Sequence, residues 1–366
     1  MGGRINNHPS RPGPTRISPA AVRALPKADL HSHIDGSISP KELFRIARKH
    51  HRKVVTPEGA ELESVSAFMG HIKGDGYVSM LDDIIRRFYP ITRLLQTEET
   101  IREAGVSYLK GQNDDGVVYA EGRFAPQYHT AEGLSLGGVI SSMAEGLAEG
   151  TERYGVETSL IVAIGRESPP GLGEEVARAA VRSGVAVALD LGGPEAGNPP
   201  EKFERAFRLA TSSGLKVTIH AGEDAGSRRQ DVANMKTALE MGADRLGHAI
   251  HLSHERNLLS TVLDRSVGIE MNPVSNLVLG KIKTTKDLGI DRLLKEGVSV
   301  SLNSDDPSLW TGGDLSEVYS RVCSEYGFGM DQVDALAENA FRSSFASQRV
   351  KERLVQRYRE AQRRIC

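Results

Sequence analysis

The sequence predicts an α/β protein folded as a closed (β/α)8 barrel, the TIM-barrel architecture, with a helical insertion after the first strand. Short apolar runs rich in β-branched residues recur along the 366 residues, with helical patterns between several of them. The runs are continuously apolar, as strands of a parallel sheet are when both of their faces are buried. Alternating strands and helices imply right-handed βαβ units. Eight expected strands make a closed barrel the most economical arrangement.

The first expected strand is the segment Ala28-Asp29-Leu30-His31-Ser32-His33-Ile34. The other seven are expected at residues 117–124, 158–164, 185–191, 216–223, 245–250, 267–273 and 298–307. Helical patterns between the later strands cover residues 174–183, 201–212 and 232–241. Barrels of this class carry their chemistry at the C-terminal ends of the strands. The residues at which the strands end are therefore the candidates for a functional site.

About 80 residues separate the first expected strand from the second, far more than one crossover helix needs. Helices are expected there at residues 40–50, 77–88 and 98–110. We expect this insertion, about residues 40–112, to lie over the catalytic end of the barrel, where it either caps the site and excludes water or is a structural addition.

Composition limits the classes of function. The net charge of −2 and a pI near 6.6 give no electrostatic footprint for nucleic acid or an anionic membrane. No apolar run is long enough to predict a transmembrane helix. Residues 1–20 are polar and rich in Pro, Gly and Arg, which indicates a disordered tail. Residues 21–366 are expected to form a single domain, although the length of the chain alone also allows two. Two cysteines, Cys323 and Cys366, favour a reducing cytoplasm over a disulfide framework. The sequence leaves the oligomeric state open.

His31 and His33 are the first residues that point to chemistry. Residues i and i+2 of a strand face the same side, so the two imidazoles project together from the strand end. Paired imidazoles are the beginning of a site for zinc and similar metals. Later strands end in further polar residues, which a barrel would place at the same end as His31 and His33. These residues are His220, His248, Asp305 and Asp306.

These segments together resemble the adenosine deaminase family of the amidohydrolase superfamily. The resemblance is carried by residues 25–37 (LPKADLHSHIDGS), 117–126, 220–223 (HAGE), 247–248 (GH) and 301–307 (SLNSDDP). The segments follow in the family's order and extend from about residue 25 to beyond residue 310. The resemblance implies a (β/α)8 barrel that hydrolytically deaminates a 6-aminopurine with the help of zinc.

The resemblance also implies a ligand set for the metal, namely His31, His33, His220 and Asp305. Three imidazoles and a carboxylate suit zinc. Two-metal members of the superfamily usually carry a modified lysine on strand four, whereas residues 189–193 here read LDLGG. One Zn²⁺ per chain is therefore expected.

Catalytic and substrate-binding roles follow from the same resemblance. Glu223 is expected to transfer the proton to purine N1, His248 to orient the attacking water, and Asp305 to accept a proton from that water. The implied substrate contacts are His33, Asp35 at the ribose 5′-hydroxyl, Gly193 at N3 and Asp306 at N7. Because N7 only accepts hydrogen bonds, Asp306 must be protonated to bind it. Six histidines are interpreted instead as surface or packing residues: His50, His51, His71, His129, His251 and His254.

The substrate that the sequence favours is a nucleoside, adenosine or 2′-deoxyadenosine, because adenine deaminases of this fold commonly carry Glu where Asp35 stands. An anionic Asp35 would also repel a 5′-phosphate. Alternatives that remain open are adenine and a 5′-modified nucleoside such as aminodeoxyfutalosine. Hydrolysis of a cyclic amide is a more distant alternative, against which Asp306 and Glu223 argue because the resemblance places them at the purine. A catalytically silent purine-binding or partner-binding relative is the alternative of a different class. Glu121 and Arg123 are interpreted as a structural ion pair, and Asn272 stands where a cysteine is more usual in the family.

Overall fold

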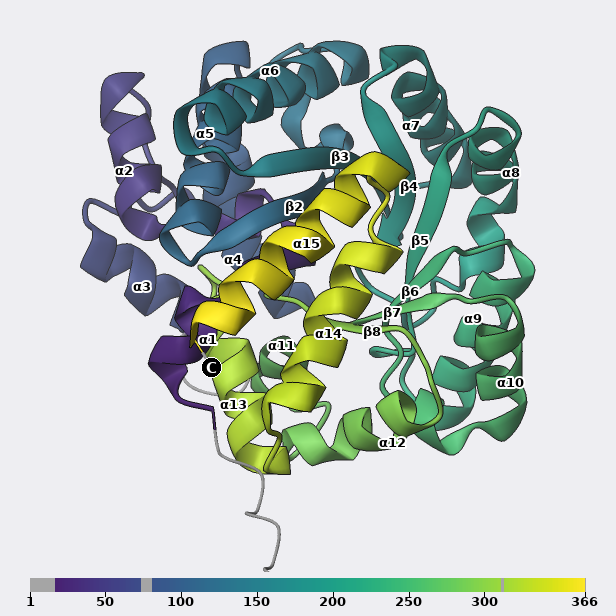
Figure 1. Cartoon of the computed structure of the whole chain (residues 1–366). Coiled ribbons are helices and arrows are strands. Elements are labelled where there is room, and N and C mark those ends of the chain that lie inside the picture. The colour runs from purple at the N-terminus through teal and green to yellow at the C-terminus, as the bar shows by residue number, and fades with distance from the viewer. Residues whose placement is uncertain (1–16, 74–80, 311–312, 366) are drawn as a thin grey trace, which may run out of the picture.

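A computed structural model of the chain describes residues 17–73, 81–310 and 313–365. Its centre is one parallel sheet of eight strands in the order β1 to β8 (Figure 1). The strands are β1 (Lys27–His33), β2 (Val117–Phe124), β3 (Glu157–Gly165), β4 (Ala186–Gly192), β5 (Lys216–Ala221), β6 (Arg245–His248), β7 (Gly268–Met271) and β8 (Val300–Leu302). The sheet order follows the chain order, as repeated βαβ units require.

The sheet curls until its first strand meets the segment that follows its last strand. The His33 N–H donates to the Asp305 carbonyl and the Asp305 N–H donates to the His31 carbonyl, both over 2.9 Å. This bridge between Ser32 and Asp305 nearly closes the barrel. The architecture is the (β/α)8 barrel that the sequence predicts.

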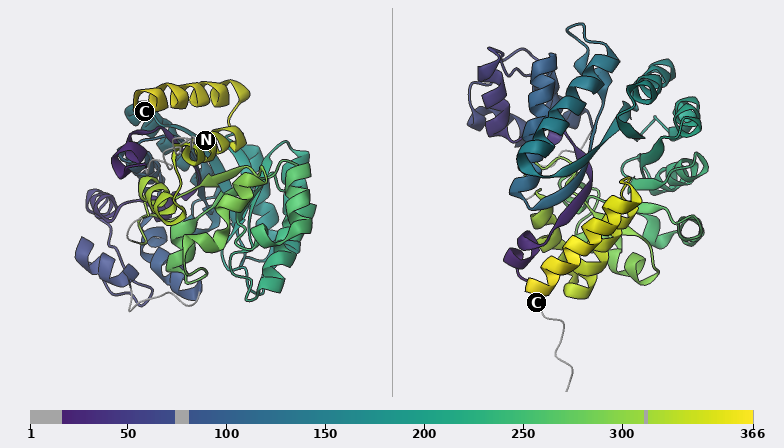
Figure 2. Two further views of the ribbon diagram at one scale, coloured as in Figure 1. Left: turned by 60° about the horizontal axis from the view of Figure 1, so that its bottom comes forward. Right: turned by 45° about the horizontal axis from the view of Figure 1, so that its top comes forward.

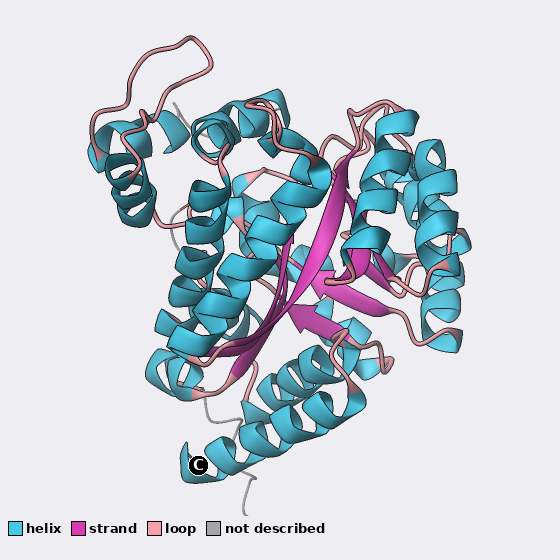
Figure 3. Ribbon diagram, turned by 90° about the horizontal axis from the view of Figure 1, so that it is seen from above, coloured by secondary structure: helices cyan, strands magenta, loops and turns pink. Residues whose placement is uncertain are grey.

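Helices surround the strands (Figures 2 and 3). Those that follow β2 to β7 are α6 (Leu136–Tyr154), α7 (Pro170–Ser183), α8 (Glu204–Ser212), α9 (Arg228–Glu240), α10 (Arg256–Asp264), α11 (Pro273–Val278) and α12 (Ile290–Lys295). Three more complete the chain after β8: α13 (Leu315–Tyr326), α14 (Met330–Ser343) and α15 (Gln348–Ile365). The last two lie side by side (Figure 1), where the Tyr358 hydroxyl donates to Asp334 over 2.7 Å.

The long segment after β1 is helical, as expected, and part of it lies over the histidines. It contains α2 (Pro40–Lys49), α3 (Val65–Lys73), α4 (Leu81–Leu94) and α5 (Glu98–Asp114). The Phe88 ring of α4 lies 6.4 Å from the His33 ring, edge to face. The helix expected at residues 77–88 is thus observed further along the chain, and residues 77–80 of that expectation lie outside the described ranges.

Five strands, β1 and β5 to β8, end earlier than expected, and left-handed backbone lies near the ends of three of them. β5 stops before Gly222 (φ +75°), β6 stops at His248 (φ +63°), and β8 stops at Leu302, three residues before Asp305 (φ +63°). Left-handed backbone cannot continue a strand. It turns the chain at the mouth of the barrel, so the candidate residues of these segments lie at or just beyond the strand ends.

The N-terminal region differs from the expected tail at its last residues. Helix α1 (Pro19–Ala24) begins inside residues 1–20, because Ser18 caps it by accepting from the Ala21 N–H over 3.2 Å and Pro19 fixes its first turn. Residues 1–16 lie outside the described ranges. Within those ranges, the helices are all too short or too polar to cross a membrane.

Candidate functional site

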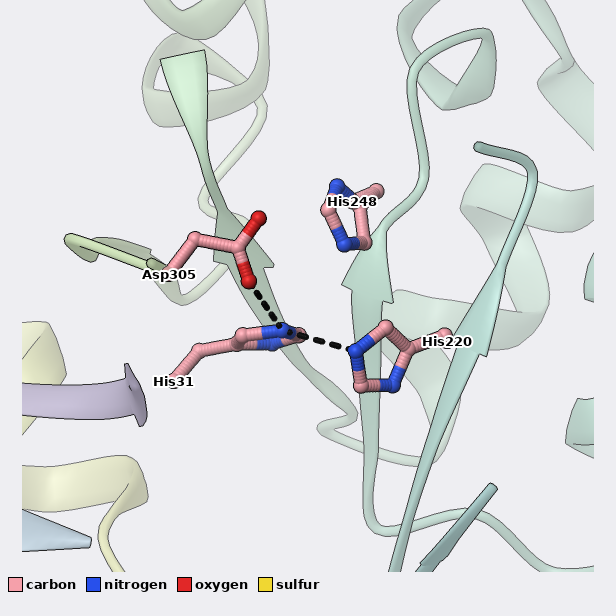
Figure 4. Close-up of side chains that lie close together, drawn as sticks. All are labelled: His31, His220, His248 and Asp305. Atoms are coloured by element: carbon pink, nitrogen blue, oxygen red, sulfur yellow. Dashed lines mark hydrogen bonds and ion pairs between the residues drawn. The ribbon is translucent and has the colours of Figure 1, made fainter. Parts of the chain in front are cut away.

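Side chains from three strands and the turn after β8 converge at the mouth of the barrel (Figure 4). One potential ligand atom from each of His31, His220, His248 and Asp305 lies within 4.8 Å of the others, and all four residues are buried. His33, Asp305 and Asp306 form an overlapping group on the same criterion. The structure therefore brings together the residues that the strand ends predict to converge.

Four atoms of this group lie at the spacing of a metal coordination sphere. His220 Nε2 is 3.0 Å from His31 Nε2 and 3.2 Å from His33 Nε2. Asp305 Oδ1 is 3.3 Å from His31 Nε2 and 3.4 Å from His33 Nε2. Ligands held about 2.0–2.1 Å from a tetrahedral zinc ion would themselves be about 3.3 Å apart. The observed spacing matches this value.

Two buried carboxylates fix the tautomers of two of these histidines. Glu270 lies 2.7 Å from His31 Nδ1, and Asp190 lies 3.1 Å from His220 Nδ1. Burial alone would raise the pKa of both carboxyls, but positive neighbours, among them Arg123, hold both well below their ordinary values. Ionised carboxylates only accept, so each Nδ1 must carry the proton. Each Nε2 is left with a lone pair.

The two lone pairs then face each other over 3.0 Å in a buried space. Two acceptors at this distance repel each other unless a cation lies between them. Imidazole nitrogens and a carboxylate oxygen are ligands that zinc and its neighbours in the first transition row accept. The residues present therefore fit a metal ion of this class.

Arg123 links the two carboxylates behind the histidines. Its guanidinium donates to Asp190 and to Glu270, both over 2.9 Å, and all three side chains are fully buried. Outer partners of this kind orient metal ligands and increase their basicity. The expected ion pair between Glu121 and Arg123 is not the arrangement found, because Glu121 pairs instead with Arg245.

Glu223 lies on the turn after β5 and faces His248. Its Oε2 is 3.6 Å from His248 Nε2. Burial raises the pKa of Glu223 to about 8, and the nearby charges of Asp305 and Glu195 act in the same direction. The carboxyl is therefore able to hold or release a proton near neutral pH.

His248 is held on its other side by an amide. Asn276 Nδ2 lies 3.0 Å from His248 Nδ1, and Asn272 Nδ2 lies 3.2 Å from His248 Nε2, so an amide group stands at each ring nitrogen. Burial lowers the pKa of His248, which favours the neutral ring. The Asn272 amide lies 3.2 Å from the same ring, so the residue that departs from the usual cysteine also touches the site.

Asp306 is buried, and its Oδ1 has no hydrogen-bond partner among the described residues. Burial raises its pKa well above the ordinary value, and Asp305, Asp35 and Glu223 raise it further against the opposing effect of His33. A protonated, unpartnered carboxyl is a donor available to a ligand. Gly36 makes room for it, because a Cβ there would lie 1.8 Å from Asp306 Oδ1.

Asp35 and Gly193 lie on turns that follow β1 and β4. Asp35 is 5% exposed, and its Oδ2 lies 3.8 Å from the buried His129 Nε2. His129 is therefore a neighbour of a candidate site residue and not a surface residue. Gly193 has φ +92°, and a Cβ there would lie 3.1 Å from Glu167 Oε2. Glycine suits both this backbone and a close approach of ligand.

Sequence reasoning missed the residues that support the site from behind. Asp190 and Glu270 are acidic residues inside apolar strands β4 and β7, and an ionisable residue in a buried strand was the available signal. Glu195, in the loop after β4, and Asn276, in α11, gave no such signal because their partners come from distant segments.

Comparisons with known proteins agree with this geometry. A family model described as adenosine deaminase matches residues 26–361. The adenosine deaminase of Enterococcus faecalis is 31% identical over 342 residues, which cover 93% of this chain and 98% of that protein. The adenine deaminase of Wolinella succinogenes is 30% identical over 332 residues, 90% of this chain and 96% of that protein. The crystal structure of an adenine deaminase from Arthrobacter aurescens superimposes with a TM-score of 0.82 at 28% identity and covers 93% of this chain and 99% of that one.

Proposed function

Because the chain belongs to the adenosine deaminase family, whose members are hydrolytic deaminases, we propose that this enzyme acts on a purine nucleoside. In the proposed reaction water replaces the 6-amino group of adenosine or 2′-deoxyadenosine, which yields inosine or 2′-deoxyinosine and ammonia. The similar proteins include adenosine and adenine deaminases. Deamination of a purine is common to both names, and the nucleoside is the finer proposal.

Asp35 is the observation that carries the choice of a nucleoside. It follows the end of β1 that carries His31 and His33, lies on the short helix η1 (Asp35–Ser37), and is nearly buried beside His129. A carboxylate there can accept a hydrogen bond from a ribose hydroxyl, a group that adenine lacks. Its negative charge opposes a 5′-phosphate. A neutral ribose therefore suits this end of the site best.

One zinc ion per chain would be held by His31, His33, His220 and Asp305, the four residues at coordination spacing. When bound, such an ion lowers the pKa of water toward neutrality and so supplies a nucleophile. Glu270 and Asp190 keep the Nε2 atoms of His31 and His220 available as ligands.

Glu223 would move the proton that the ring needs. As the oxygen of water bonds to C6 and the carbon becomes tetrahedral, N1 gains negative charge and takes the proton from the Glu223 carboxyl. Burial, which raises the pKa of Glu223, favours the protonated carboxyl. His248 would orient the attacking water, and Asp305 would accept a proton from it. The 6-amino group would then take the proton that Asp305 accepted and leave as ammonia, while the C6 hydroxyl returns a proton to Glu223 and C6=O forms.

Three further residues would fix the purine in the site. Asp306, protonated and unpartnered, would donate to N7, and the Gly193 N–H would donate to N3. The His33 side chain remains 19% exposed, so it could contact the substrate as well as the metal. These contacts would hold C6 at one orientation to the metal ligands.

A panel of 6-aminopurines assayed for ammonia release tests the proposal, with adenosine expected to be the preferred substrate. Asp35→Ala is expected to lower kcat/KM for adenosine by roughly ten- to a hundred-fold, since a hydrogen bond to a charged group contributes about 1.5–3 kcal/mol. Activity on adenine is expected to change much less. An equal loss on both substrates would mean that Asp35 supports the metal ligands. Preference for adenine, or for a 5′-modified nucleoside such as aminodeoxyfutalosine, would contradict the adenosine assignment.

A further inference from the structure

The turn that carries Glu223 is bound to a buried carboxylate from another loop. Glu195, three residues beyond the end of β4, is 3% exposed. Its Oε1 accepts from the Gly222 N–H over 2.9 Å, and its Oε2 accepts from the N–H groups of Glu223 and Asp224 over 2.9 and 3.0 Å. Three consecutive peptide N–H groups therefore point at one side chain.

The Glu195 carboxylate has enough acceptor positions for all of the N–H groups that converge on it. Gly222 has φ +75°, which lets consecutive N–H groups converge as they do in anion-binding turns. A fourth donor, Asn234 Nδ2 on α9, reaches Oε1 over 2.9 Å. Glu195 uses both of its oxygens as acceptors, and two of its four donors, the Gly222 N–H and the Asn234 amide, are buried groups that need a partner.

Buried Arg166 holds the start of the same turn. It donates to the His220 carbonyl, two residues before Gly222. The backbone between a metal-ligand candidate and Glu223 is thus held by an arginine at one end and by Glu195 at the other. These contacts fix the backbone that carries Glu223, whose Oε2 lies 3.6 Å from His248 Nε2.

We propose that Glu195 is a positioning residue, which holds the backbone of residues 222–224 so that the Glu223 carboxyl meets the purine ring at the geometry of proton transfer. The inference rests on the proposed role of Glu223. Glutamine in place of Glu195 keeps the shape but turns an N–H₂ group toward one of the converging N–H donors, so the turn must shift. A displacement of about 1 Å in a catalytic group costs on the order of 10²-fold in rate.

The test compares Glu195→Gln and Glu195→Asp with a matched control on the same turn. Asp231 is also buried, and it accepts from the next N–H along the turn, that of Ala225, over 2.7 Å. Asp231→Asn therefore disturbs the same segment beyond Glu223. For Glu195→Gln we expect kcat for adenosine to fall about ten- to a hundred-fold, with KM within about three-fold and metal content unchanged. Glu195→Asp should lose less, and Asp231→Asn should stay within about three-fold of the parent.

Parental kcat in both Glu195 variants would overturn the proposal. So would an equal fall of kcat in Asp231→Asn, or a loss of metal in parallel with kcat, because either would show a general structural role. Failure of both Glu195 variants to fold, while Asp231→Asn folds, would likewise assign Glu195 to folding. Glu223→Gln is measured alongside: if it keeps activity, the proposed function of Glu223 is wrong, whereas an inactive Glu223→Gln beside active Glu195 variants refutes only the role of Glu195.

Discussion

The Glu223 carboxyl combines burial, a raised pKa of about 8 and a position 3.6 Å from His248 Nε2. A solvated glutamate on a loop has none of these properties. We predict that Glu223→Gln lowers kcat by about 10²–10⁴-fold, because an amide keeps the shape but cannot transfer a proton. KM and metal content should change little, since the proton transfer belongs to the transition state. Steady-state kinetics with adenosine and metal analysis check this, and a loss of only a few-fold would contradict the assignment.

A second prediction concerns pH and the same carboxyl. In the proposed reaction Glu223 is protonated when it donates to N1, so activity should be higher below its pKa and should fall as pH rises through it. Burial, Asp305 and Glu195 raise this pKa to about 8, and a bound cation lowers it. We therefore expect kcat/KM to decline on a basic limb with a midpoint at or below pH 8. A profile that stays flat to pH 10 would contradict protonated Glu223 as the donor.

Local spacing explains which site residues the sequence could predict. His31 and His33 are separated by one residue in a strand, and His220, His248 and Asp305 end apolar runs, so strand periodicity and barrel topology together predict convergence. Glu195 and Asn276 act across 28 residues in each case, from Glu195 to Glu223 and from His248 to Asn276. Only the folded backbone brings such partners together, and neither stands at a strand end.

At the scale of the elements, the strands supply two layers of residues to the barrel interior. The outer layer holds the candidate metal ligands, and the inner layer holds the buried charges of Arg123, Asp190 and Glu270. The sequence predicts the outer layer, because its residues stand where apolar runs stop. Inside the strands, the sequence pattern does not show which acidic and basic residues form ion pairs. Arg123 was expected to pair with Glu121, but it pairs with Asp190 and Glu270.

Glu270 is the central member of the inner layer, since it accepts from Arg123, Arg245 and Thr218 and contacts His31. We predict that Glu270→Gln destabilises the fold by about 1–3 kcal/mol, because the amide N–H₂ cannot accept from the buried donors that one Glu270 oxygen satisfies. Asp190 and Glu121 still pair with Arg123 and Arg245. Metal affinity should fall about 10–100-fold through His31. Denaturant unfolding of the metal-loaded protein and a metal titration measure these effects.

An exposed ion pair provides the control for this variant. Glu204 pairs with Arg208 four residues along α8, and both side chains are more than half exposed. Glu204→Gln should change stability by less than about 0.5 kcal/mol and leave metal binding unaltered. If Glu270→Gln behaves like Glu204→Gln, the inner charges do not support the metal ligands.

At the scale of the whole molecule, the candidate metal ligands lie on both sides of the seam where the barrel closes. His31 and His33 belong to β1, and Asp305 follows β8, yet the two segments are joined by a single bridge at Ser32 and Asp305. Strand order and helical insertion were predictable from apolar runs and their spacing. The way the seam closes was not, because the expected last strand ran to residue 307, whereas β8 ends at Leu302 and Asp305 forms an isolated bridge with left-handed backbone.

This position of the ligands leads to a prediction for the entire fold. A metal bound by the first strand, the fifth strand and the turn after the last strand would connect segments that are 274 residues apart in the chain, from His31 to Asp305. A ligand that binds only the folded state stabilises it by about 4.1 kcal/mol at a thousand times its Kd. We expect chelation to lower Tm by several degrees and to abolish deamination, and we expect zinc to restore both at one equivalent per chain.

Three measurements check this prediction: metal analysis of the purified protein, thermal unfolding and an ammonia-release assay. The last two are made before chelation, after chelation and after zinc is added back. The parts fail separately. Full activity without metal would contradict the proposed chemistry, and two equivalents per chain would contradict a single site. Restored activity with an unchanged Tm would mean that the metal does not stabilise the closed barrel. The bridge at Ser32 and Asp305 and the packing of the helices would then be sufficient to close it.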